Sequence, residues 1–205
     1  MRHSLKFLTP ALACLLVIGL QVPAWAGLSA NDQEQVVRIE AYLNTLKTMQ
    51  ARFLQIDAAG GVALGNVYMR RPGRMRFEYE PPAQILVVAD GTWLVFRDNE
   101  IEETTRLPLF STPVSVLLKE NIELSGDVTV TKVENDGKAV RVTIVDTDNP
   151  DEGNITLVFS DAPLQLRQWL VTDAQGNTTS ISLSNMQKDI KLKPELFTFF
   201  DSDYE

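Results

Sequence analysis

The chain has 205 residues, of which 44% are hydrophobic and 22% are charged, and its 27 acidic against 19 basic side chains give a net charge of −8. This length and apolar content suit one domain that buries a core or lines a cavity. The acidic excess argues against nucleic acids and anionic membrane surfaces as partners.

The first 26 residues have the layout of an export signal. "MRHSLK" is basic, "FLTPALACLLVIGL" is apolar, and "AWA" at 24–26 is a small-x-small cleavage site. We predict an exported protein, cleaved after Ala26, with a single domain over 27–205. Cys14 raises the alternative of a lipid-anchored protein, but the apolar run before it is short and contains Pro10.

Cleavage after Ala26 limits the chemistry of the remaining chain. His3 and Cys14 are the only histidine and cysteine, and both lie in the leader. The exported chain then has no imidazole or thiol, which excludes serine–histidine triads, cysteine nucleophiles, zinc sites of the Cys/His type and disulfides. Carboxylate and lysine chemistry remain.

The next segment, 29–47, is predicted to be an amphipathic helix. Ser29 or Asn31 can cap it, and an apolar stripe recurs at three-to-four spacing from Val36 to Leu46. After it the period changes to two, which is typical of strands. We predict strands at 49–57, 62–71, 74–80, 84–90, 92–98, 100–106, 127–135, 138–146, 154–160, 164–173 and 177–185.

Two segments interrupt this pattern. Thr112 followed by Pro113 predicts a short apolar helix over 112–119. Residues 193–200 predict a turn of helix and a last strand. The sequence therefore indicates a mainly β fold of ten or eleven antiparallel strands, forming an incomplete (open) barrel or strongly curved sheet. Its concave face needs a cover, and the helices at 29–47 and 112–119 are the available lid.

Large apolar side chains alternate along the first five strands. They are Phe53, Val67, Met69, Met75, Phe77, Tyr79, Leu86, Val88, Trp93, Val95 and Phe96. One interpretation is an ordinary core between sheet and helix. The other is a cavity for acyl chains, in which flexible methionines repack around ligands of varied shape. Alternation alone does not decide between them.

Four arginines stand beside this row, at positions 70, 71, 74 and 76. They can form a solvated strand face balanced by nearby acids. Arg71, just before Pro72, is different if it points to the concave side, because a buried charge there needs carbonyl partners. The free carbonyls at the end of a lid helix can supply them.

Carboxylates are common, but no pair of them has the layout of a catalytic or metal site. The loop "DTDNPDEGN" at 146–154 has a calcium-like composition without the spacing of a helix–loop–helix calcium site. A hydrolase that uses paired carboxylates is a further alternative, but no acid and base can be assigned. We expect no enzymatic activity, metal or cofactor.

Several motifs occur together in a fixed order. They are "RFLQ" at 52–55, Gly65, "RRPGRMRFEYEPP" at 70–82, "VVADGTWLVFRD" at 87–98, "TPVSVLL" at 112–118 and "ELFTF" at 195–199. Together they resemble the periplasmic outer-membrane lipoprotein carrier (LolA) family.

This resemblance implies an incomplete β-barrel closed by a helical lid, whose interior receives lipoprotein acyl chains. The apolar row from Phe53 to Val95, together with Val114, would line that interior. Arg71 would hydrogen-bond lid carbonyls near Leu117 and Leu118 in the closed form. Met75 matches a position where some relatives have phenylalanine.

The implied carrier is a monomer that works in the periplasm. It takes lipoproteins from an ATP-driven releasing complex in the inner membrane and delivers them to an outer-membrane receptor or directly to the outer membrane. The alternative is a non-transporting module of the same fold that binds or senses lipids or lipoproteins.

Overall fold

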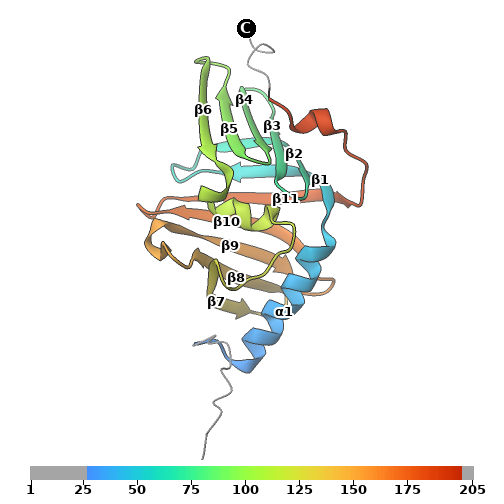
Figure 1. Ribbon diagram of the computed structural model, residues 1–205, viewed down its shortest axis with the longest axis vertical. Helices are drawn as coiled ribbons and strands as arrows, with labels where there is room; N and C mark the ends of the chain where they lie inside the picture. The colour runs from blue at the N-terminus through green and yellow to red at the C-terminus, as the bar shows by residue number, and fades with distance from the viewer. Residues whose placement is uncertain (1–26, 200–205) are drawn as a thin grey trace, which may run out of the picture.

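The computed structural model describes residues 27–199, so the predicted signal peptide, its cleavage site and Cys14 lie outside the described residues. Eleven antiparallel strands form one sheet in the order β6-β5-β4-β3-β2-β1-β11-β10-β9-β8-β7 (Figure 1). The strands are β1 (Thr48–Ile56), β2 (Val62–Arg70), β3 (Arg74–Tyr79), β4 (Ile85–Asp90), β5 (Trp93–Asp98), β6 (Glu103–Pro108), β7 (Val128–Asn135), β8 (Ala139–Asp146), β9 (Gly153–Ser160), β10 (Gln165–Asp173) and β11 (Thr178–Lys188).

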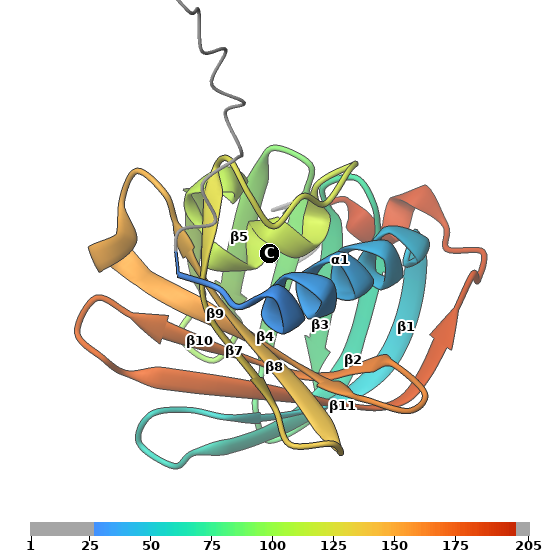
Figure 2. The ribbon, with the colours of Figure 1, turned by 90° about the horizontal axis from the view of Figure 1, so that it is seen from below.

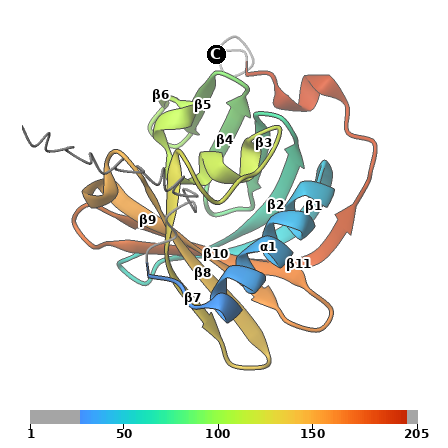
Figure 3. The same ribbon diagram turned by 60° about the horizontal axis from the view of Figure 1, so that its bottom comes forward.

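The sheet is strongly curved and is not closed into a barrel. Within the described chain, β6 and β7 are its two ends and do not pair with each other. Helix α1 (Ala30–Thr45) and the 3₁₀-helices η1 (Leu109–Ser111) and η2 (Pro113–Leu118) lie on its concave side (Figures 2 and 3). The predicted mainly β architecture, an open sheet covered by helices, is confirmed.

Helix α1 begins where its sequence provides a cap. The Ser29 hydroxyl accepts a hydrogen bond from the Asp32 amide, and the Asp32 carboxylate accepts one from the Ser29 amide. This reciprocal capping box satisfies amides that have no partner inside the helix. Val36, Ile39 and Leu43 form the buried stripe of α1, so the predicted amphipathic helix packs its apolar face on the sheet.

Three predicted elements differ from the observed ones. The segment after Thr112 forms the 3₁₀-helix η2 rather than an α-helix. Strand β6 starts three residues later than predicted, because the turn before it extends through Glu102, whose φ is +56°. The segment 193–199 contains the 3₁₀-helix η4 (Pro194–Phe197) and no strand among its described residues.

The pairing register assigns residues of β1–β6 to the two faces of the sheet. Phe53 is opposite Gly65, which is opposite Tyr79, and these positions face α1 and the core. We call this side the concave face and the other side the outer face. A Cβ at Gly65 would lie 2.1 Å from the Glu78 carbonyl oxygen and 2.6 Å from Cε1 of Phe53. The ring of Phe53 therefore occupies space that only glycine leaves open.

The chain after β11 returns across the outer face. Helix η4 packs against β3 and β4 there, and the Phe197 side chain is completely buried. An Arg76 guanidinium N–H donates to the Leu196 carbonyl oxygen at 3.3 Å, and the Arg70 guanidinium carbon lies 5.8 Å from the centre of the Phe197 ring. This segment covers apolar side chains that the strands present away from the concave face.

Candidate functional site

The concave face of β1–β3 gathers six of the residues predicted to line a cavity. They are Phe53, Val67, Met69, Met75, Phe77 and Tyr79. The ring of Phe53 makes edge-to-face contacts with Phe77 at 5.2 Å and with Tyr79 at 5.0 Å between centroids. The predicted Val114, on η2, packs against the same cluster while partly exposed.

Four other predicted lining residues lie on the opposite side of the sheet. Leu86, Val88 and Val95 are buried on the outer face, since their register partners are Glu78, Arg76 and Arg106. Trp93, opposite Pro108, shares that face and is exposed.

The sequence did not show which residues of β4 face the cavity, because both alternating sets of side chains in "ILVVAD" are apolar. The register gives the concave side to Val87 and Ala89, which belong to or pack on the core cluster. Helix η4, at sequence positions far from β4, covers the other set.

Trp169 on β10 is a lining residue that the sequence reasoning missed. Its side chain is 1% exposed, and its ring centroid lies 6.2 Å from that of Phe77 across the concave face. Only the pairing of β1 with β11 brings β10 into this neighbourhood. The alternating pattern of "LQLRQWLVTD" marks it as a strand residue that faces one side, which was the only available signal.

The interior is almost completely filled in this closed form. The cavity beneath the lid measures about 10 Å³, which is room for about one water molecule. It is lined by Leu43, Leu46, Met49, Met69, Met75, Leu117, Ile122, Leu166 and Trp169. The members of the apolar row on β1–β3 are therefore a packed core in the closed form, and the closed cavity is too small to hold an acyl chain.

Arg71 ties the covers of the sheet to the end of β2. It is 8% exposed and is the one charged or polar residue buried in the described part of the chain. Its guanidinium donates to the carbonyl oxygens of Leu43 (2.6 Å), Leu46 (3.2 Å), Lys119 (2.7 Å) and Glu120 (2.9 Å) and to the Asn44 side-chain oxygen (3.2 Å). We call this arrangement the Arg71 latch.

The latch acceptors differ in part from the predicted ones. The carbonyls near Leu117 and Leu118 were expected to bind Arg71, but the guanidinium reaches the two residues that follow η2. The Leu118 carbonyl instead accepts from the Gly73 amide at 2.8 Å, and the Leu117 side chain lines the small cavity. The carbonyls of Leu43 and Leu46 at the end of α1 agree with the expectation that the free carbonyls of a lid helix bind Arg71, although these two residues were not named in advance.

Side chains of α1 add hydrogen bonds of their own to the segment after η2, and one of these side chains, Asn44, also accepts from Arg71. Asn44 donates to the Ile122 carbonyl at 2.8 Å and accepts from the Ile122 amide at 2.9 Å. The Glu40 carboxylate accepts from the Leu124 amide at 2.5 Å. Helix α1 and residues 119–124 therefore form one connected cover, which the latch fastens to the β2–β3 turn.

The electrostatics of the site match this latch role. Burial lowers the pKa of Arg71, because leaving water disfavours the charged form. A guanidinium still keeps its proton in proteins, so the latch stays charged at neutral pH. Within residues 27–199 its partners are neutral oxygens and no carboxylate forms an ion pair with it. Water can replace neutral acceptors more easily than a paired carboxylate.

Tyr79 adds a polar group to the aromatic cluster. Its hydroxyl donates to the Gln55 side-chain oxygen at 2.6 Å. Burial raises the pKa of Tyr79 to about 12, so the phenol is neutral at physiological pH.

The described residues hold neither a metal-binding cluster nor a membrane-spanning helix. Among residues 27–199, no three acidic, histidine or cysteine side chains are grouped to hold a metal ion. No helix in that part of the chain is both long and apolar enough to cross a membrane.

Comparison with known families shows to which family this chain belongs. The family model described as outer membrane lipoprotein carrier protein LolA matches residues 44–200. This chain belongs to the LolA family. The LolA match spans all eleven strands, and it includes Arg71 and four of its five acceptor residues, Asn44, Leu46, Lys119 and Glu120.

Two sequence relatives agree with the LolA assignment. The outer-membrane lipoprotein carrier protein of Chromobacterium violaceum is 31% identical over 85% of this chain and 87% of its own length. The carrier of the same description from Methylococcus capsulatus is 26% identical over 93% and 94%. A solved LolA superfamily structure from Nitrosomonas europaea aligns over 85% of this chain and 99% of its own, with 12% identity and a TM-score of 0.48.

Proposed function

We propose that this LolA-family protein is a periplasmic carrier that shields the acyl chains of lipoproteins between its curved sheet and its lid. The observation that carries the proposal is the Arg71 latch beside a cavity lined by apolar side chains. The names of relatives that are outer-membrane lipoprotein carriers support it. The protein works without catalysis, as a chaperone of insoluble chains.

Loading begins with opening of the cover. Because the closed interior has room for about one water molecule, an acyl chain enters only where lining side chains and the cover move aside. Each methylene buried gains about 0.8 kcal/mol. The gain is opposed by rupture of the latch, whose hydrogen bonds from a charged donor contribute about 1.5–3 kcal/mol each.

The free-energy cost of breaking the latch makes release of the cargo possible. A carrier that bound acyl chains with the full free energy of hydrophobic burial would not release them. Since the latch re-forms when the chains leave, the closed empty state lowers the free energy of the carrier after delivery. The cargo then passes downhill to a better acceptor, and no ATP is needed in the periplasm.

Membership of the LolA family supports a route for the cargo. An ATP-driven complex in the inner membrane supplies the lipoprotein, and an outer-membrane receptor or the outer membrane itself accepts it. The leader at residues 1–26 directs export, with cleavage after Ala26 and a single carrier domain from Gly27 onward. The carrier acts as a monomer.

A release assay tests the proposal. Inner-membrane vesicles that hold newly made lipoproteins are incubated with ATP and the purified protein, and acylated lipoprotein is measured in the soluble fraction. Soluble complexes that require both ATP and the protein are expected. Omission of ATP and use of a non-acylated cargo are the controls. If an active membrane preparation releases nothing, the protein is a passive lipid-binding or sensing module instead.

A further inference from the structure

One edge of the molecule carries a basic groove beside the latch. The groove has a volume of about 540 Å³, and its walls include Arg70, Arg74, Lys119, Glu120 and Phe110. The turn between β2 and β3 forms its floor together with Gly91 of the β4–β5 turn. A chain with a net charge of −8 therefore concentrates cations at one place on its surface.

Two of these cations have no counterion in the part of the chain that the structure describes. Arg70 and Arg74 are directly opposite each other in the β2–β3 pair, and both are partly exposed. Like charges directly opposite one another destabilise a sheet. Among residues 27–199 neither guanidinium donates a hydrogen bond or forms an ion pair; Arg70 only stacks over the ring of Phe197.

The other charged groups of the groove are largely engaged. Arg71 is committed to the latch, and Lys119 pairs with Asp127 at 3.0 Å. Asp90, opposite Arg74, accepts hydrogen bonds from the Thr92 and Trp93 amides in its own turn. The Glu120 carboxylate is the one acid of the groove wall, and it is exposed.

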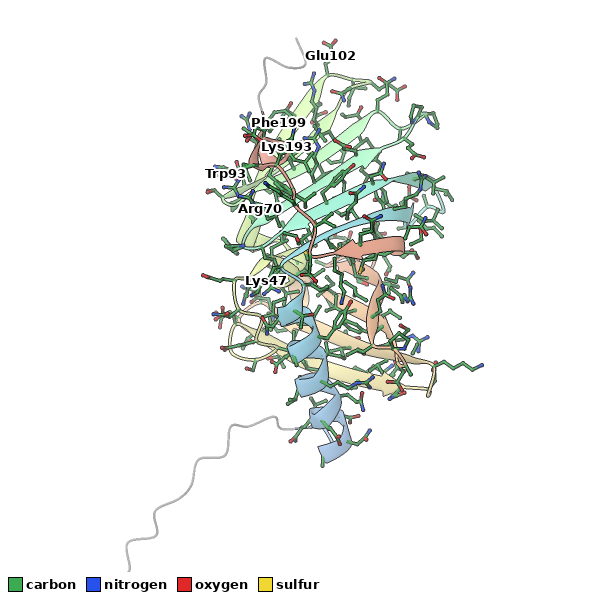
Figure 4. The ribbon with its side chains drawn as sticks, turned by 90° about the vertical axis from the view of Figure 1, so that its right-hand side faces the viewer. Lys47, Arg70, Trp93, Glu102, Lys193 and Phe199 are labelled. Carbon is green, nitrogen blue, oxygen red and sulfur yellow. The ribbon has the colours of Figure 1, made fainter. Side chains whose placement is uncertain are left out.

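Exposed apolar side chains border the groove. Trp93 is 43% exposed and lies at the same strand ends as Arg70 and Arg74, because the Arg74–Asp90 pair leads directly into the β4–β5 turn. Phe110 on η1 is 62% exposed and lines the groove itself. Figure 4 shows Lys47, Arg70 and Trp93 along one edge of the molecule.

We propose that this edge docks on an anionic lipid bilayer, with a lipid phosphate held in the groove between Arg70 and Arg74. Arginine guanidinium groups match phosphate geometry, and tryptophan and phenylalanine enter the interface of a bilayer. An acidic segment of a protein would satisfy the arginines but not the exposed aromatic rings. Docking would place the Arg71 latch, which borders the groove, close to the membrane.

The negative net charge of the chain argues against binding to an anionic membrane. Salt screening removes this conflict, because most of the acidic side chains lie far from the groove. Charges farther than a Debye length, about 10 Å at 0.1 M salt, are largely screened. Acids on the β7–β9 half of the sheet therefore weaken docking little at physiological salt. The proposal goes beyond the carrier function, since a carrier can load and unload through protein partners alone.

Vesicle binding of the cargo-free exported protein tests the proposal. Vesicles of phosphatidylglycerol with phosphatidylcholine are compared with phosphatidylcholine alone by flotation. Each basic residue near an anionic surface contributes about 1 kcal/mol to binding, so Arg70→Gln with Arg74→Gln should weaken it about thirtyfold. Lys132→Gln with Lys138→Gln removes the same charge from the β7–β8 hairpin and should leave binding unchanged.

Tryptophan fluorescence reports where the protein touches the lipid. In the described residues, Trp169 is buried and Trp93 is exposed, so bromine-labelled lipids should quench Trp93 alone, and Trp93→Phe should abolish the quenching. Absence of binding to the anionic vesicles, or equal binding by both double variants, would overturn the proposal. A third result would also overturn it: the arginine double variant loses cargo delivery, while neither it nor the unsubstituted protein binds vesicles. That result would assign the groove to a protein partner. None of these results would affect the release assay, which tests the carrier function separately.

Discussion

Replacing Arg71 with leucine isolates the latch. Leucine places an apolar side chain at the site. It removes all five hydrogen bonds of the guanidinium, which go to the C-terminal end of α1 and to the segment after η2. Five bonds from a charged donor, at about 1.5–3 kcal/mol each, give roughly 7–15 kcal/mol. Removing a guanidinium from water costs several kcal/mol. The closed form should therefore lose about 3–5 kcal/mol relative to the open one, which changes their ratio by roughly a hundredfold to a few thousandfold.

The expected phenotype follows from that shift. Arg71→Leu should still load lipoprotein, because opening becomes easier, but should deliver it at least tenfold more slowly, because closing no longer favours release. Delivery is measured as transfer of labelled lipoprotein from the purified complex to outer-membrane vesicles. Amide exchange at Gly73 and Ile122, whose hydrogen bonds join the cover to the sheet and to α1, should accelerate in the empty variant.

Two further variants control for the loss of an arginine. Arg97 donates to Asn99, Glu102 and Thr104 within the β5–β6 hairpin, so Arg97→Leu loses a comparable set of bonds that does not cross the cover. It should deliver normally. Arg71→Lys keeps the charge with fewer donors and should be intermediate. Normal delivery by Arg71→Leu, with unchanged exchange at Gly73, would refute the latch.

Three other predictions concern stability. The pKa of Tyr79 is about 12 in the folded protein and near 10 when unfolded, so its contribution is present below pH 10 and is lost as pH rises toward 12; in urea titrations, Tyr79→Phe should show a smaller loss across that window. Gly65→Ala should lower the free energy of unfolding by more than about 2 kcal/mol, since its Cβ meets the Glu78 carbonyl, whereas Asn66→Ala on the neighbouring position should cost well under that. Phe197→Ala should cost about 3–5 kcal/mol by thermal unfolding, and an unchanged melting temperature would show that η4 does not cover the outer face.

The sequence was sufficient to predict the order of the elements, because the change of period from 3.6 to 2 after Leu46 and the turn residues between strands are local signals. It was not sufficient to assign the faces of β4 and β5. Their two alternating sets are both apolar, and a distant segment, η4, decides which set meets the core.

For the latch, too, the local sequence indicated the donor residue but not the distant residues that accept its hydrogen bonds. Arg71 stood out in the sequence through its place before Pro72 and through the family resemblance. Its acceptors at Leu43 and Glu120 come from segments 28 and 49 residues away along the chain. Which carbonyl a long guanidinium reaches depends on how the cover sits on the sheet, and no local pattern encodes that.

The two unpaired edges of the sheet have a mechanical consequence. In a closed barrel, the circumference is fixed by the number of strands and their stagger, so expansion breaks ladder hydrogen bonds. Here β6 and β7 end the sheet without meeting. The curvature can relax as the cover lifts while every strand keeps its neighbours, so expansion of the sheet breaks no hydrogen bonds between strands. An open sheet of this kind can therefore change its interior volume to fit ligands of different width.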